Sequence, residues 1–102
     1  MAGQRGSTVS GKAYTTSNTD ILEFGAPRFV RTGVVFYIYA STVGTAIVHY
    51  KDPSGTFREM QSTACAANDL TTIVFDFPIS ELKLTYKGTS SGGTVNAEGR
   101  GF

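Results

Sequence analysis

Few residues in this chain can do acid–base, nucleophilic or metal chemistry: it has one histidine, His49, one cysteine, Cys65, and eight carboxylates. A catalytic site needs a base, a nucleophile or a metal held in mutual geometry. In the hairpin predicted below, Glu59 lies opposite His49 and would orient its ring, but the spacing supplies no third partner. A histidine on an exposed strand face is more commonly a solvated surface residue. The sequence therefore predicts that the protein is not an enzyme and has no catalytic residues.

Metal, cofactor and phosphate sites are not indicated either. One histidine and one cysteine make a structural zinc site improbable, and Asp52, Asp69 and Asp76 lack the spacing of a calcium loop. The glycine-rich stretch 88–93, GTSSGG, is not followed by Lys-Ser/Thr or by a helix, so we predict a hairpin turn rather than a phosphate loop. Cys65 stands among small residues and is expected to be a buried small hydrophobe. No cofactor is predicted.

Length and charge limit the possible partners. The chain has 102 residues and a net charge of +1, which allows one small domain and gives no strong electrostatic footprint for nucleic acid or an anionic membrane. No apolar run reaches the roughly 18 residues that span a bilayer. The first twenty residues contain no apolar stretch suited to a signal peptide. We therefore expect no nucleic-acid partner, no membrane partner and synthesis in the cytoplasm.

The elements that must position these residues are strands. Val, Ile, Thr, Phe and Tyr account for 39 residues, against 30 good helix formers, and Gly and Ser supply turns. Period-2 segments recur about every ten residues, which is typical of a sandwich or jelly roll. We predict an all-β fold, an antiparallel β-sandwich or jelly roll of seven to eight strands, as a single domain over residues 19–102. The expected strands cover 19–24, 29–31, 34–41, 44–51, 56–62, 70–77, 82–87 and 94–98.

Alternation in the strongest strands separates a core face from a contact face. Phe36 and Ile38 are assigned to the core, together with alternate residues of the neighbouring strands. The opposite faces would present four apolar or aromatic side chains in a patch that marks a contact surface: Val35, Tyr37, Tyr39 and Val74. Loops or the N-terminal segment covering this strand would be the alternative. A carbohydrate platform is a further option, although the chain has no Trp.

The segment 52–55, Asp-Pro-Ser-Gly, predicts a hairpin with a three-residue loop and a G1 bulge, with Gly55 in the left-handed region. This loop places Tyr50 opposite Arg58, His49 opposite Glu59 and Val48 opposite Met60. A four-residue loop would instead pair Val48 with Glu59 and mix charge into the apolar face. The bulged register is therefore predicted, with Ala46, Val48 and Met60 in the core.

Residues 1–18 differ in composition from the rest of the chain. They are rich in Gly, Ser and Thr, carry Arg5 and Lys12 without an acid, and have only Val9 and Tyr14 as sizeable apolar groups. Such a stretch cannot bury enough apolar area to offset its ordering entropy. We expect a flexible N-terminal arm, either a frayed terminus or a segment that orders on a partner through Arg5, Lys12 and Tyr14.

Residues 34–99 carry a wider pattern: a strand–turn–strand around the D-x-x-G hairpin at 52–55, a phrase ending in F-x-F-P at 75–78, and two strands around an SSGG-like turn within 82–97. This pattern resembles the small jelly-roll or β-sandwich virion proteins of tailed bacteriophages, most closely the capsid cement (decoration) proteins. The resemblance covers about two thirds of the chain.

The resemblance implies a non-enzymatic virion protein on the capsid exterior. It would bind the major capsid protein in the assembled shell, staple neighbouring capsid subunits, and act as a homo-oligomer, either a dimer or a trimer. Two other roles stay open at this point: a head–tail adaptor or tail structural component, and a carbohydrate- or receptor-binding β-sandwich module.

Overall fold

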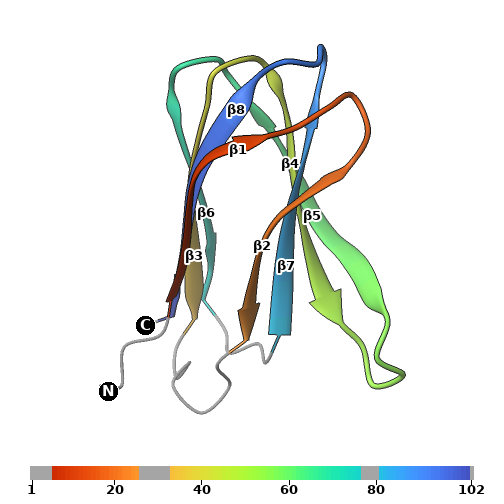
Figure 1. The fold of residues 1–102 in the computed structure, drawn as a ribbon. Coiled ribbons are helices and arrows are strands. Elements are labelled where there is room, and N and C mark those ends of the chain that lie inside the picture. Colours follow the sequence, from red (N-terminus) through yellow and green to blue (C-terminus); the bar gives the residue numbers. More distant parts are fainter. Residues whose placement is uncertain (1–5, 26–32, 77–80, 102) are drawn as a thin grey trace.

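The computed structural model describes residues 6–25, 33–76 and 81–101. Within these residues eight strands and no helix are present, and the strands form two antiparallel sheets of four that pack face to face (Figure 1). The strands are β1 (Gly6–Ala13), β2 (Thr19–Gly25), β3 (Val34–Ala40), β4 (Gly44–Lys51), β5 (Phe57–Cys65), β6 (Leu70–Phe75), β7 (Glu81–Gly88) and β8 (Thr94–Gly101). The predicted all-β sandwich is confirmed. The short strand expected at 29–31 lies outside the described residues.

The strand order shows how the chain is rolled. One sheet has the order β1-β8-β3-β6 and the other β2-β7-β4-β5. Each strand of the first half pairs with its counterpart from the second half: β1 with β8, β2 with β7, β3 with β6 and β4 with β5. This is one long antiparallel ribbon folded over on itself, the eight-stranded arrangement of a jelly roll.

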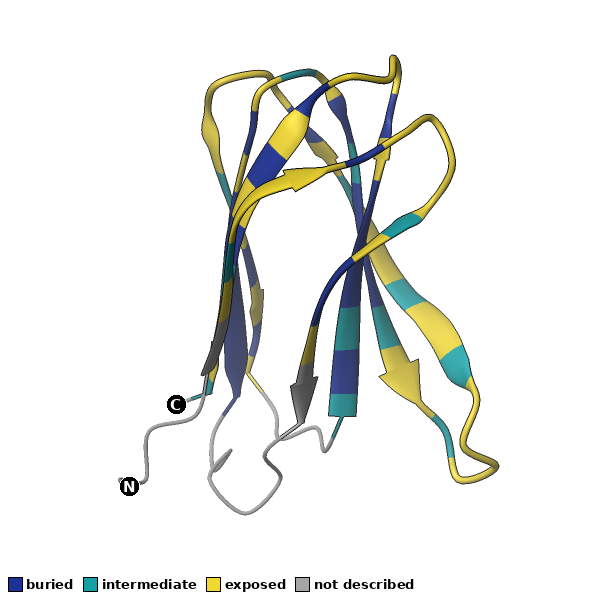
Figure 2. Cartoon of the chain, in the orientation of Figure 1, coloured by how far each residue is buried: buried dark blue, intermediate teal, exposed yellow. Residues whose placement is uncertain are grey.

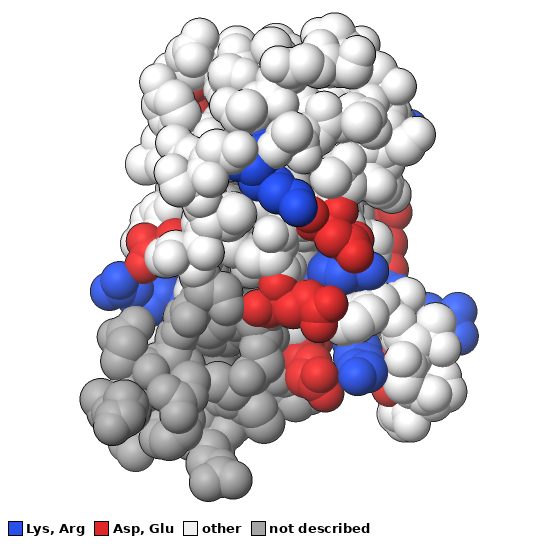
Figure 3. Space-filling model, viewed as in Figure 1, with Lys and Arg blue, Asp and Glu red and all other residues white. Residues whose placement is uncertain are grey.

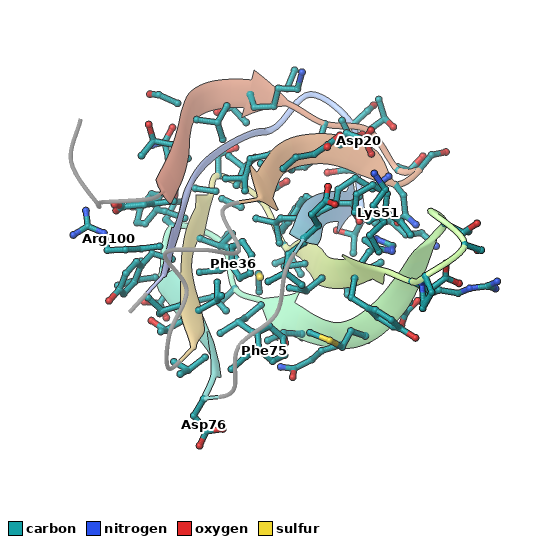
Figure 4. All side chains as sticks on the ribbon, turned by 90° about the horizontal axis from the view of Figure 1, so that it is seen from below. Asp20, Phe36, Lys51, Phe75, Asp76 and Arg100 are labelled. Carbon is teal, nitrogen blue, oxygen red and sulfur yellow. The ribbon has the colours of Figure 1, made fainter. Side chains whose placement is uncertain are left out.

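The core lies between the two sheets, where alternate residues of the interior strands meet. Phe36 and Ile38 of β3 are fully buried, and Phe36 and Phe75 point into the space between the sheets (Figure 4). Buried and exposed residues alternate along the strands, as period 2 requires (Figure 2). Other predicted core residues are buried as well: Val34, Ala40, Ala46, Val48, Ile73, Leu82, Leu84, Tyr86, Val95 and Ala97.

The β4–β5 hairpin follows the predicted register only near its turn. Gly55 has φ +87°, Tyr50 pairs with Arg58, and His49 pairs with Glu59. The register then shifts, so Val48 pairs with Gln61 rather than with Met60. A bulge in β5 leaves Met60 as an extra residue, and its side chain packs only partly buried against the core.

The flexible arm expected over residues 1–18 is wrong for residues 6–13, which form β1 and pair with β8. The sandwich therefore begins before residue 19. The pairing supplies the backbone hydrogen bonds and the half-buried Val9 packs on the core, so tertiary contacts compensate for a composition that favours disorder. A register shift between Val9 and Lys12 accommodates Gly11, which has φ +65°.

Tyr14, expected to bind a partner, is instead only 2% exposed and joins the core. Its hydroxyl accepts a hydrogen bond from the backbone N–H of Thr42 at 3.1 Å and also bonds with the Thr42 hydroxyl. The Tyr86 hydroxyl donates to the Thr42 carbonyl at 3.0 Å, and the two tyrosine rings are 4.6 Å apart between centroids. Thr42 lies between β3 and β4, so this cluster joins the end of β1 to that turn and to β7.

Glycines make room for the two rings. A Cβ on Gly93 would lie 2.6 Å from Tyr14 Cζ, one on Gly88 would lie 2.6 Å from Tyr14 Cε1, and one on Gly44 would lie 2.5 Å from Tyr86 Cε2. Real Cβ atoms do not approach other atoms so closely, so these positions need glycine for space. Burial raises the pKa of the Tyr86 phenol, which keeps its hydroxyl protonated as a donor.

The Tyr14→Phe variant tests this cluster. It leaves the partly buried Thr42 N–H without its hydrogen-bond acceptor, so we expect a loss of about 1–3 kcal/mol in the free energy of unfolding, measured by chemical denaturation. Tyr37→Phe is the matched control, because the exposed Tyr37 should change stability by no more than about 0.5 kcal/mol. Equal stability of the two variants would show that the Tyr14 hydroxyl contributes nothing.

Candidate functional site

The outer face of the β1-β8-β3-β6 sheet carries the largest exposed aromatic and aliphatic side chains that lie together. The register of β3 with β6 and β8 sets them in rows across the sheet. One row contains Leu70, Tyr39 and Asn96, the next Thr72, Tyr37 and Glu98, and the third Val74, Val35 and Arg100. We call Tyr37, Tyr39, Leu70 and Val74 the tyrosine face.

The exposed fractions identify which side chains are available to a partner. Tyr37 is 39% exposed, Tyr39 42%, Leu70 58% and Val74 54%. Three of the four predicted contact residues thus lie on one face and are accessible. The exposure expected for Val35 is wrong, because it is only 9% exposed. Val35 sits in an interior strand, with Arg100 and Val74 beside it on both neighbouring strands.

An open groove of about 280 Å³ crosses this face. Its lining combines the two phenol rings with aliphatic and polar side chains: Thr8, Val9, Tyr37, Tyr39, Leu70, Asn96, Ala97 and Glu98. The groove therefore follows the sheet from β6 across β3 and β8 to β1. It offers flat ring faces beside an amide, a carboxylate and a hydroxyl.

The polar side of the groove is held in place by local bonds. Asn96 Oδ1 accepts a hydrogen bond from the Gly11 N–H at 2.7 Å, which ties the irregular part of β1 to β8. The Arg100 guanidinium bonds to Glu98 Oε2 through Nη2 at 2.6 Å and through Nε at 3.1 Å. Arg100 points away from the core on this outer side (Figure 4).

Two of the three N-terminal residues predicted to bind a partner are described, and their surroundings differ. Arg5 lies outside the described residues. Lys12 is exposed on β1, and Tyr14 is buried in the core. Leu70 was not among the predicted contact residues, although it shares the alternation that placed Val74 outward, and that alternation was sufficient to find it.

His49 lies on the outer face of the other sheet and is half-buried rather than solvated. Its Nε2 lies 3.0 Å from the hydroxyl of Thr85, which in turn donates to the Ile47 carbonyl at 3.5 Å. Glu59 is opposite on β5, as predicted.

Cys65 is buried in the core, also as predicted, and so does not share a surface with His49. Among the described residues, no group of three or more His, Cys, Asp and Glu is placed to hold a metal ion.

Charges of both signs alternate on the side of the molecule seen in Figure 3. The ion pair between Lys83 and Asp20 measures 3.5 Å, and so does the pair between Lys51 and Glu81. This surface therefore presents paired charges rather than a patch of one sign. Within residues 6–25, 33–76 and 81–101, no helix has the length and hydropathy to cross a bilayer.

The surroundings of His49 predict a pH dependence of stability. Partial burial, followed by the nearby Lys83 ammonium, lowers the pKa of His49 below its usual 6.5, and the carboxylates of Glu59 and Asp20 only partly oppose this. The unfolded chain then binds the proton more readily than the folded chain. The free energy of unfolding should fall as the pH drops from about 7 through 6.5 and the lower pKa of the folded state.

The measurement is urea denaturation between about pH 7.5 and 5.5, which stays above most carboxylate titration. His49→Gln should flatten the pH dependence in that interval while retaining a hydrogen-bonding group for Thr85. A His49→Gln profile with the same slope as the parent protein would contradict the inferred pKa direction.

Comparisons with known proteins support the fold. No protein-family model and no curated protein matches the chain. Among solved structures, a crystal structure of PirA is similar over 98% of this chain and 94% of its own length, at 10% identity and a TM-score of 0.56. The structural neighbours also include a viral protein, from the structure of infectious bursal disease virus Gx strain. It matches over 96% of this chain and 32% of its own, at 12% identity and a TM-score of 0.43. The chain thus shares its fold with PirA across nearly the full length of both.

Proposed function

We propose that this protein is a non-enzymatic virion structural protein that binds the outer surface of an assembled phage capsid and staples neighbouring subunits of the major capsid protein. The observation that carries the proposal is the tyrosine face. A free domain of this size has no structural need to expose two tyrosines, a leucine and a valine together on one sheet.

The chemistry of this face suits a protein partner. Tyrosine is enriched among the residues that dominate binding energy at protein interfaces, because its ring offers apolar area and its hydroxyl a hydrogen bond. Tyr37 and Tyr39 protrude from β3, an interior strand paired on both sides. The face is therefore rigid before binding, so docking costs little conformational entropy.

The mode of attachment differs from the one that the sequence suggested. Since residues 6–14 are part of the sandwich, they are not available as an extended arm, and contact with the capsid would use the sheet face. A weak contact at each subunit is sufficient when it repeats over a lattice, because linked copies raise the effective affinity. Binding to the assembled shell alone would then stabilise the shell by mass action.

A saccharide is a second candidate ligand, and the groove favours it. Sugar rings stack on aromatic faces through their apolar C–H groups, and their hydroxyls bond to amides and carboxylates. Tyr37, Tyr39, Asn96 and Glu98 offer both kinds of contact in one open groove. On a glycan array, binding that is retained in Tyr37→Phe and lost in Tyr37→Ala would support this role.

Copy number in purified virions separates the structural roles. A cement protein should approach the copy number of the major capsid protein, measured by quantitative mass spectrometry, and should leave the particles as they lose stability. A small number of copies per particle would indicate a head–tail adaptor or tail component instead. Absence from virions would overturn the proposal.

Substitutions on the tyrosine face test the docking surface directly. The double variant Tyr37→Ala/Tyr39→Ala should weaken binding to capsids about thirtyfold or more, since hot-spot truncation commonly costs about 2 kcal/mol. The matched control is Tyr50→Ala, which removes an exposed tyrosine of β4 in the other sheet. Co-sedimentation with capsids measures both. An equal loss in the control, or none in the double variant, would exclude the tyrosine face as the contact surface.

A further inference from the structure

The four edge strands of the sandwich, β1, β6, β2 and β5, are protected to different degrees. The register of β1 shifts between Val9 and Lys12, that of β2 between Asp20 and Leu22, and that of β5 at the bulge that contains Met60. Each of these three strands also carries at least one charged residue. Bulges and charges are the devices by which proteins prevent an edge from pairing with another chain.

Strand β6 has neither device. Its six residues, Leu-Thr-Thr-Ile-Val-Phe, contain no charge and no proline, and they pair with β3 without any register shift. Among the described residues, β6 is the last strand of its sheet and pairs with β3 alone. A regular, uncharged edge strand is a template for a further strand.

We propose that two copies of this chain associate through β6, antiparallel, with Thr72 opposite the partner's Thr72. The two four-stranded sheets then become one sheet of eight strands. The pairing involves only the β6 edge and does not depend on the capsid proposal.

The register follows from the two faces of the strand. Directly opposite residues of an antiparallel pair share a face, so outward-facing residues of one strand oppose outward-facing residues of the other. Centring the two-fold axis on Thr72 places Leu70 opposite the partner's Val74, twice, and Thr71 opposite the partner's Ile73. Centring it on Ile73 would place Leu70 opposite the partner's Asp76. The Thr72 register joins apolar residues and adds a Thr–Thr pair, both of which stabilise sheets.

A second copy fits this edge because the strand complements itself. The exposed Leu70 and Val74 each gain a cross-strand apolar neighbour. Asp69 and Asp76 flank β6, outside the strand itself. The Thr72 register places Asp69 opposite the partner's Phe75 at each end of the pairing, so no like charges oppose one another. The two-fold axis is perpendicular to the sheet, so both tyrosine faces lie on the same side of the dimer.

Cysteine cross-linking tests the register. Directly opposite residues have Cβ atoms about 5 Å apart, close to the separation that a disulfide requires. Thr72→Cys should therefore form a covalent dimer under mild oxidation, seen on a non-reducing gel. Ser62→Cys, at an exposed position of the β5 edge, is the matched control and should stay monomeric. Cys65 is buried in both variants.

Introducing a charge at Thr72 provides a second test of the association. In sedimentation experiments the parent chain should be in a monomer–dimer equilibrium, and Thr72→Lys should weaken it about fivefold or more by opposing two ammonium groups. Ser62→Lys should leave the equilibrium unchanged. A parent chain that is monomeric at high concentration, a dimer insensitive to Thr72→Lys, or equal cross-linking by both cysteine variants would overturn the proposal.

Discussion

The fold depends on the hydrogen bonds that two buried tyrosines make with a single residue, Thr42. Tyr14 and Tyr86 both bond to Thr42, in the turn between β3 and β4, and their rings lie against each other in the core. Glycines on the surrounding strands leave the space that the rings occupy. Through this cluster the end of β1, the β3–β4 turn and β7 are joined, so contacts far apart in sequence close one end of the sandwich.

Alternation was enough to predict most of the core, because each interior strand has one face that water cannot reach. Phe36 and Ile38 in β3, and Leu82 and Leu84 in β7, are buried as their spacing required. The hairpin register was predictable from the turn residues as far as His49. Beyond it, the bulge at Met60 could not be predicted, since nothing local to β5 requires an extra residue there.

The N-terminal strand and Val35 show where sequence patterns stop being informative. The first strand has few apolar residues, and its order comes from pairing with β8, which lies at the other end of the chain. Intrinsic composition therefore gave the wrong state for residues 6–13. Alternation put Val35 on the correct face but could not show that its neighbours on β6 and β8 cover it.

Because β1 is held in the sheet, recognition by the described residues must use faces and edges. The tyrosine face and the unprotected β6 edge belong to the same sheet, and Leu70 and Val74 are part of both. Pairing at the edge would therefore extend the face rather than compete with it. In the proposed register, outward-facing residues of one β6 oppose outward-facing residues of the other, so both tyrosine faces lie on the same side of the dimer. Two faces on one side could contact adjacent subunits of a lattice at once. The same alternation that builds the core would thus allow the proposed dimer to contact two subunits of the proposed capsid partner.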